Sequence, residues 1–166
     1  MPAKKNYILD RSVANKKLRR MALEILENNA GEKQVILAGI RGSGSVVARC
    51  IQQILSETGD LKTDLITINL DKRKPKEVTL SKDIDFNDRV IIVTDDVSNS
   101  GKTLLYSLKP FLEFHPKKIQ TLVLVERTHT GFPVRPDYVG LSIATTLQEH
   151  IYVEVEGEQI TGAYMQ

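Results

Sequence analysis

Three short apolar runs constrain the fold of this chain more than any other feature of its sequence. They lie at residues 35–38, 90–93 and 119–125, and each runs into a turn or loop of small or polar residues. Short, continuously apolar segments are typical of strands that are buried on both faces of a parallel sheet. Helical periodicities accompany them, over residues 18–26 before the first run and residues 46–55 after it. This order predicts an α/β fold with a central, mostly parallel sheet flanked by helices.

The remaining segments extend this pattern without indicating a second domain. Residues 65–70 and 151–155 alternate between polar and apolar side chains and are predicted as strands, the second of them at an edge. A helix begins near Gly101 and is interrupted at Pro110, because proline cannot continue the hydrogen bonding of a helix. We therefore predict a single domain over residues 1–166.

The composition of the chain limits the partners and the cellular compartment that we expect for the protein. Hydrophobic residues make up 41% of the chain and charged residues 27%, a balance typical of globular proteins. The net charge is only +2, so any attraction to nucleic acid would have to come from a local basic patch. Cys50 is the single cysteine, and no apolar run approaches the roughly 20 residues that span a bilayer. We expect a cytoplasmic protein with no membrane partner.

The turn after the second apolar run carries the most chemistry. Two adjacent carboxylates, Asp95 and Asp96, follow the strand closely, and the hydroxyl-rich segment 98–103 then opens a helix. Free amides at the start of a helix attract anions, and the hydroxyl groups and lysine of this segment add donors for one phosphate group. The acids would repel that phosphate, so we predict that they accept hydrogen bonds from a ribose diol or hold a divalent cation. A sugar phosphate matches both halves of the turn.

A plain structural turn is the alternative interpretation of the same string. A serine or an aspartate can cap the helix, and water can solvate two exposed acids. Adjacent acids at the end of a buried strand are costly without a partner, however, and this favours the ligand-binding interpretation.

The string resembles the signature of the type I phosphoribosyltransferases, which bind 5-phosphoribosyl-1-pyrophosphate (PRPP). Its acid pair, Asp95 and Asp96, matches that signature, as do Ser100, Gly101 and Thr103, whereas Thr94 replaces a usual apolar residue. The resemblance implies that the two acids are catalytic, hold the ribose and bind Mg²⁺, directly or through water. It also implies a loop that binds the 5′-phosphate, formed by Ser98, Asn99, Ser100, Gly101, Lys102 and Thr103.

Two further basic segments take their predicted roles from the same resemblance. The turn after the first apolar run contains Arg41, Gly42 and Ser43, which correspond to the pyrophosphate-binding loop of the family. The segment at about 71–88 corresponds to a flexible loop that closes over PRPP, and its Lys72 and Arg73 would neutralise the leaving pyrophosphate. Arg41 and Lys72 therefore join the predicted catalytic residues. The alternatives are a tight capped turn for the first segment and a solvated charged loop for the second.

The resemblance also predicts a small hood at about residues 127–166. It places the nucleobase against Tyr138, Val139 and Gly140, mainly through their backbone groups. Residues 7–145 resemble in particular a branch of the family that uses uracil and also binds messenger RNA through a basic face. The residues that could form such a face here are Arg19, Arg20, Arg127, His129 and Arg135.

These observations favour a Mg²⁺-dependent enzyme that transfers ribose 5-phosphate from PRPP to a nucleobase and releases pyrophosphate. Uracil is the base that the resemblance favours, and the family implies a homodimer or homotetramer. A nucleotide-sensing, RNA-binding regulator with little or no catalysis is the main alternative, because the closing loop is short. A purine phosphoribosyltransferase is a weaker alternative, because Asn99 stands where some purine-using members carry an acid that acts as general base.

Overall fold

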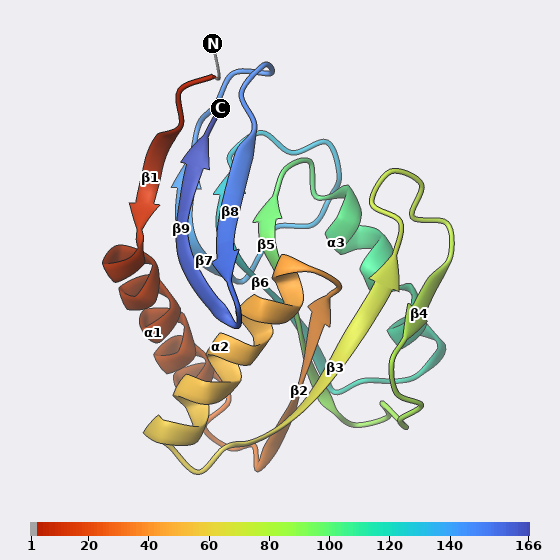
Figure 1. Ribbon diagram of the computed structural model, residues 1–166. Coiled ribbons are helices and arrows are strands. Elements are labelled where there is room, and N and C mark those ends of the chain that lie inside the picture. The colour runs from red at the N-terminus through yellow and green to blue at the C-terminus, as the bar shows by residue number, and fades with distance from the viewer. Residues whose placement is uncertain (1–2) are drawn as a thin grey trace.

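A mostly parallel sheet forms the centre of the protein, in a computed structural model that describes residues 3–166; the first two residues of the predicted domain lie outside that range. Its strands are β2 (Gln34–Ile40), β3 (Lys62–Leu70), β4 (Val78–Leu80), β5 (Val90–Ser98), β6 (Lys118–Arg127) and β7 (Tyr138–Ile143). They are arranged in the order β4-β3-β2-β5-β6-β7 (Figure 1), and all pair in parallel except β4, which is antiparallel to β3. The predicted α/β class is confirmed.

Helices cover both faces of this sheet. On one face lie α1 (Arg11–Asn28) and α2 (Ser43–Thr58), and on the other lie α3 (Lys102–Ser107) and the 3₁₀ helix η1 (Lys109–Glu113). The interruption predicted at Pro110 is confirmed, because the α-helix ends at Ser107 and the proline lies in the first turn of η1. None of the helices within residues 3–166 is long and apolar enough to cross a membrane.

The alternation of side chains along each strand divides the interior into two cores. Val90 and Ile92 on β5 face the core beneath α1 and α2, whereas Ile91 and Val93 face the core that contains Phe111. All five side chains are buried, and burial of each large apolar side chain contributes about 1.5–3 kcal/mol. This packing fixes the level at which β5 ends, and with it the position of the residues that follow.

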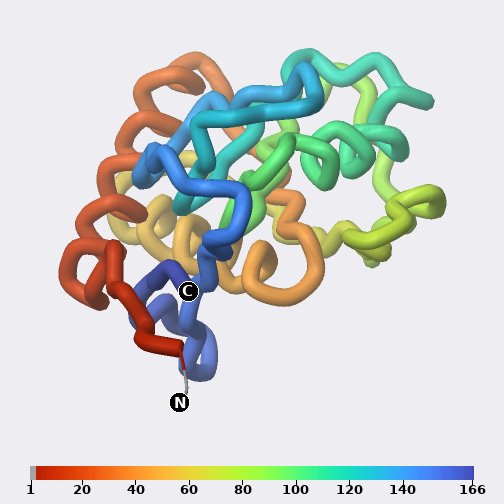
Figure 2. The backbone as a smooth tube through the Cα atoms, turned by 90° about the horizontal axis from the view of Figure 1, so that it is seen from above, coloured from red at the N-terminus to blue at the C-terminus, as the bar shows by residue number. Residues whose placement is uncertain are grey.

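A second sheet brings the two ends of the chain together. It consists of β1 (Asn6–Asp10), β9 (Gln159–Met165) and β8 (Ile151–Glu156), in the order β1-β9-β8, and both pairings are antiparallel. Figure 2 shows this small sheet at one corner of the molecule, beside α1. Residues 138–143 of the predicted hood instead extend the large sheet as β7, parallel to β6.

The carboxyl ends of the parallel strands meet at the upper edge of the large sheet in Figure 1. The turns after β2, β3, β5 and β6 all leave from this edge. Parallel α/β sheets place their ligands at this edge, so the segments that the sequence marked as ligand turns start from one region.

Candidate active site

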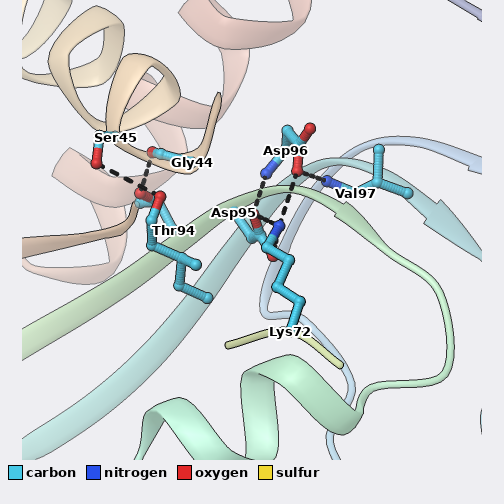
Figure 3. A network of polar contacts seen from close by, with 8 residues as sticks. Gly44, Ser45, Lys72, Thr94, Asp95, Asp96 and Val97 are labelled. Carbon is cyan, nitrogen blue, oxygen red and sulfur yellow. Dashed lines mark hydrogen bonds and ion pairs between the residues drawn. The ribbon is translucent and has the colours of Figure 1, made fainter. Parts of the chain in front are cut away.

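The acid pair at the end of β5 holds a lysine from the turn after β3. The Lys72 Nζ lies 3.2 Å and 3.3 Å from the two carboxylate oxygens of Asp95, and 3.7 Å from Oδ1 of Asp96 (Figure 3). The Asp95 side chain is 1% exposed and that of Asp96 17% exposed. The structure therefore brings together two predicted ribose-binding acids and a predicted pyrophosphate-binding lysine, from segments more than 20 residues apart.

The acid pair is largely buried and its two carboxylates are adjacent, so Lys72 does not fully offset the cost of ionising both acids. Burial, and next the charge of Asp96, raise the pKa of Asp95 to about 8, although Lys72 opposes the shift. Burial lowers the pKa of Lys72, but the carboxylates of Asp95 and Asp96 outweigh this effect and raise it overall. A single ammonium group thus offsets only part of the cost of two adjacent acids, and the pair would gain from a stronger cation.

The loop after β5 forms a polar hollow beside the acids. Its lining includes Lys72, Asp95 and the whole predicted phosphate segment, residues 98–103. Ser98 is one of the lining residues, and its buried hydroxyl has no hydrogen-bond partner within residues 3–166. Gly101 has a φ of +87°, a backbone conformation that glycine adopts readily. An unpartnered buried hydroxyl is costly, and an anionic ligand in the hollow would satisfy it.

The segment after β6 supports this loop from behind. The carbonyl oxygen of Ser100 accepts hydrogen bonds from the amides of Gly131 and Phe132, at 3.0 Å and 3.1 Å. A Cβ atom at Gly101 would lie 3.1 Å from the carbonyl oxygen of Val134. The phosphate loop is therefore held against its neighbours before any ligand binds.

The turn after β2 lies beside the acids but does not line the same hollow. Gly42, at a φ of +94°, leads into α2, and the backbone amide of Arg41 donates to the Ile68 carbonyl at 2.9 Å. The Arg41 side chain lies instead in a neighbouring hollow with Lys74 and Lys76. Of the predicted pyrophosphate residues, Lys72 lines the hollow beside the acids and Arg41 lines the neighbouring one, whereas Gly42, Ser43 and Arg73 line neither of these two. The Arg73 amide donates to the Asp71 carboxylate at 2.9 Å.

The three residues predicted to bind the base do not reach the polar hollow beside the acids, which we call the phosphate hollow for its predicted ligand. Tyr138 is buried in the core, where its hydroxyl donates to Oε1 of Gln120 at 2.7 Å. The carbonyl oxygens of Val139 and Gly140 accept hydrogen bonds from Arg20, at 2.8 Å and 3.0 Å. The reason is topological: this segment is the edge strand β7, which β6 separates from β5.

Another hollow, which we call the second hollow, adjoins the predicted phosphate loop. The sequence did not single out its residues as base-binding. This hollow shares Asn99 and Ser100 with the phosphate hollow, and its other lining residues are Arg127, His129, Thr145 and Leu147. Arg127 holds one wall in place, because its Nε donates to the hydroxyl of Thr145 at 2.6 Å. The Leu147 side chain is 95% exposed, on the loop before β8. Nothing in the local sequence marks Thr145 or Leu147, because only the fold brings their loop beside Asn99.

The acid pair near the end of β5, beside a hydroxyl-rich loop at the carboxyl edge of a parallel α/β sheet, is an arrangement that suits a sugar phosphate. Residues 6–156 match the family model described as "Phosphoribosyl transferase domain". The chain belongs to this family.

Several proteins of the family are similar over most of their length. The Bifunctional protein PyrR of Macrococcus caseolyticus is 35% identical over 161 residues, which cover 92% of each chain. The protein of the same name from Clostridioides difficile is 32% identical over 167 residues, covering 93% of this chain and 94% of that protein.

Solved structures of purine enzymes share the fold at low identity. The hypoxanthine phosphoribosyltransferase of Trypanosoma cruzi superposes with a TM-score of 0.75 at 14% identity, covering 84% of this chain and 82% of that one. A hypoxanthine-guanine phosphoribosyltransferase from Bacillus anthracis gives 0.72 at 21% identity, covering 90% and 88%. These similarities confirm the architecture alone.

Proposed function

We propose that this protein transfers the 5-phosphoribosyl group of PRPP to uracil and releases pyrophosphate. The observation that carries the proposal is the shared hollow, in which an unpartnered buried Ser98 hydroxyl lies with Asp95 and Lys72. A phosphate group would satisfy the hydroxyl, and the ribose hydroxyls would reach the acids. A sugar phosphate would therefore provide hydrogen-bond partners for both the Ser98 hydroxyl and the acids.

The acid pair suits Mg²⁺ as the accompanying cation. The position of the Lys72 ammonium beside the carboxylates of Asp95 and Asp96 supports a cation there, and so does the pKa of Asp95, which burial and the charge of Asp96 raise. Residues 3–166 contain no cluster of three or more His, Cys, Asp or Glu for a metal. That fits Mg²⁺, which proteins often hold through one or two carboxylates together with substrate oxygens. When bound, Mg²⁺ would neutralise charge on the pyrophosphate.

The reaction is a displacement at the anomeric carbon. The bond from C1′ to the pyrophosphate oxygen breaks while N1 of uracil bonds to C1′, and the N1 proton passes to solvent. Asp95 and Asp96 orient the ribose, and Lys72, released from the acids by the substrate, can follow the negative charge onto the leaving pyrophosphate. None of these steps needs a protein nucleophile.

We place the base in the second hollow, next to Asn99. That residue belongs to both hollows, so a base there stays within reach of a ribose at the acids. An amide can donate to a uracil carbonyl and accept from the N3–H group, which matches the edge of this base. Thr145 and Leu147 supply a second polar group and an apolar contact from the opposite wall.

Calorimetry with PRPP and Mg²⁺ tests the proposal at the acids. The double substitution of Asp95 and Asp96 by asparagine should abolish measurable PRPP binding and leave the folded structure intact by circular dichroism. Substitution of the exposed Asp60, between α2 and β3, is a control that should bind like the wild type. Unchanged affinity in the double variant would exclude the assigned site.

A second candidate function, a regulator that binds RNA, is favoured by the basic surface of α1. Lys16 and Arg19 are exposed on this helix, and no acid occurs between Arg11 and Leu23. Arg20, also predicted for this face, is paired with Glu24 and with the carbonyls of Val139 and Gly140. Of the other residues predicted for a basic face, Arg127 and His129 line the second hollow together. A gel shift with pyrimidine-operon leader RNA tests this function: we expect a shift that UMP enhances, and no shift at all would exclude it for that RNA. The homo-oligomer stays a prediction.

A further inference from the structure

A buried threonine connects the two ligand turns. Thr94, fully buried on β5, donates a hydrogen bond from Oγ1 to the carbonyl oxygen of Gly44 at 3.0 Å (Figure 3). Gly44 lies in the first turn of α2, directly after the predicted pyrophosphate turn, and Thr94 immediately precedes Asp95. One hydrogen bond therefore links the turn after β2 to the strand that carries the acid pair.

Close packing reinforces this link. A Cβ atom at Gly44 would lie 2.9 Å from the carbonyl oxygen of Thr94 and 3.0 Å from Oδ1 of Asp95. A Cβ atom at Gly39, at the end of β2, would lie 2.7 Å from the Cα of Ser45. The start of α2 thus lies directly against β5 beside the acid. Packing sets how close the two segments come, and the hydrogen bond sets the orientation of the Gly44 peptide.

The Gly44 carbonyl shares its peptide with the amide of Ser45, which donates to the Gly42 carbonyl at 3.1 Å, so Thr94 and this turn bond together fix the backbone just after the free amides of the turn. Ser43 and Gly44 are the first two residues of α2, and amides at this position have no acceptor within their own helix. Gly42, just before them, has a φ of +94°, so the turn contains a residue with wide backbone freedom. Without the Thr94 hydroxyl, packing alone would hold the start of α2, which carries these amides, against β5.

We propose that Thr94 is a positioning residue for the pyrophosphate half of PRPP and acts through the carbonyl of Gly44. The inference rests on the proposed function, with the pyrophosphate at the turn predicted for it, which contains Arg41, Gly42 and Ser43. Thr94 is buried beneath that turn and touches no substrate. Its hydroxyl should raise the affinity for ligands that extend into the turn. It should not change the affinity for ligands that reach only the acids.

Three variants separate this role from a general contribution to folding. Thr94→Val removes the hydroxyl and keeps the shape, in a strand whose neighbours are already Val and Ile. Thr94→Ser keeps the hydroxyl. Thr121→Val is the matched control, because Thr121 is a buried threonine on the adjacent strand β6 whose hydroxyl contacts Asp137. Thr94→Ala provides the same comparison should valine not be accommodated.

Calorimetry with two ligands gives the readout. PRPP with Mg²⁺ reaches both turns, whereas UMP carries the ribose and 5′-phosphate without pyrophosphate. Loss of one buried hydrogen bond should weaken PRPP binding by Thr94→Val roughly three- to tenfold, with UMP binding unchanged. Thr94→Ser should retain wild-type affinity for both ligands, and so should Thr121→Val.

The outcomes distinguish failure of this inference from failure of the proposed function. Equal loss of PRPP and UMP affinity in Thr94→Val, or wild-type affinity for PRPP in that variant, would overturn the role of Thr94 alone. A loss in Thr94→Ser as large as that in Thr94→Val would overturn it too. Absence of PRPP binding by the wild-type protein would overturn the proposed function, and this inference with it.

Discussion

Replacement of Asp95 by asparagine should stabilise the ligand-free protein, and the gain should grow with pH. The carboxyl group is buried beside Asp96, and its pKa is raised from 3.8 to about 8. The unfolded chain releases this proton near pH 4, whereas the folded protein keeps it until about pH 8. The folded state therefore binds more protons between these values, and its free energy of unfolding falls as pH rises through this window.

The size of the stabilisation follows from the difference between the pKa of Asp95 in the unfolded chain, 3.8, and in the folded protein, about 8. Each pH unit corresponds to about 1.4 kcal/mol, so the cost of ionising Asp95 approaches an upper limit on the order of 5 kcal/mol at pH 8. Asparagine avoids this cost and can still accept the hydrogen bond that the Asp96 amide now donates to Oδ1 at 2.9 Å. Part of the gain is lost because Lys72 then keeps only Asp96 as a charged partner. We expect a net stabilisation of at least about 1 kcal/mol at pH 8 and almost none at pH 4.5.

Urea denaturation at several pH values between 4.5 and 8 measures the free energy of unfolding of the wild type and of Asp95→Asn. The wild type and Asp95→Asn should diverge steadily as pH rises, while Asp60→Asn, which changes an exposed acid, should follow the wild type. Parallel curves for the wild type and Asp95→Asn would refute the reasoning, because they would mean that the folded and unfolded chains bind the same number of protons at this site.

Two further predictions concern the turns around the acids. Ser98→Ala should lower UMP affinity by about tenfold or more, since a hydrogen bond to a charged group contributes about 1.5–3 kcal/mol; calorimetry checks this. The same change should leave the stability of the ligand-free protein unchanged or slightly raised, because the hydroxyl has no partner to lose within residues 3–166. Gly44→Ala should destabilise the fold by about 1–3 kcal/mol in urea denaturation, because its Cβ would lie 2.9 Å from the Thr94 carbonyl oxygen. Gly131→Ala is its control, because a Cβ there meets nothing within 4 Å, and an equal loss in both variants would contradict the steric argument.

Local sequence patterns were enough to predict the framework that presents the site. Continuous apolar runs such as 90–93 indicated strands buried on both faces, but β5 continues through the two acids to Ser98, where the sequence predicted that the strand ends before them. The pairing of β5 with β6 extends the strand beyond the apolar run. The small sheet was only partly predictable. β8 alternates clearly, but β9 contains Gly162 and pairs with β1 across almost the whole chain, a contact that no local pattern encodes.

The contacts that complete the site depend on the same long-range geometry. The resemblance predicted that Lys72 neutralises the leaving pyrophosphate, and only the fold shows that it reaches Asp95. The segment at 138–140 looked available for a base, yet its place at the edge of the sheet gives its carbonyls to Arg20. Thr94 stood out in sequence as a polar residue in an apolar strand, and its partner, 50 positions earlier, became visible only in the structure.

Pyrophosphate release from PRPP and Mg²⁺ tests the central claim most directly. The reaction should be followed with uracil, and in parallel with hypoxanthine and with guanine, using the wild-type protein and the Asp95, Asp96 double asparagine variant. We predict release with uracil alone, and none from the double variant. Release with a purine base in place of uracil would contradict the assigned base, and no release with any base, from protein that binds PRPP, would contradict the assigned catalysis.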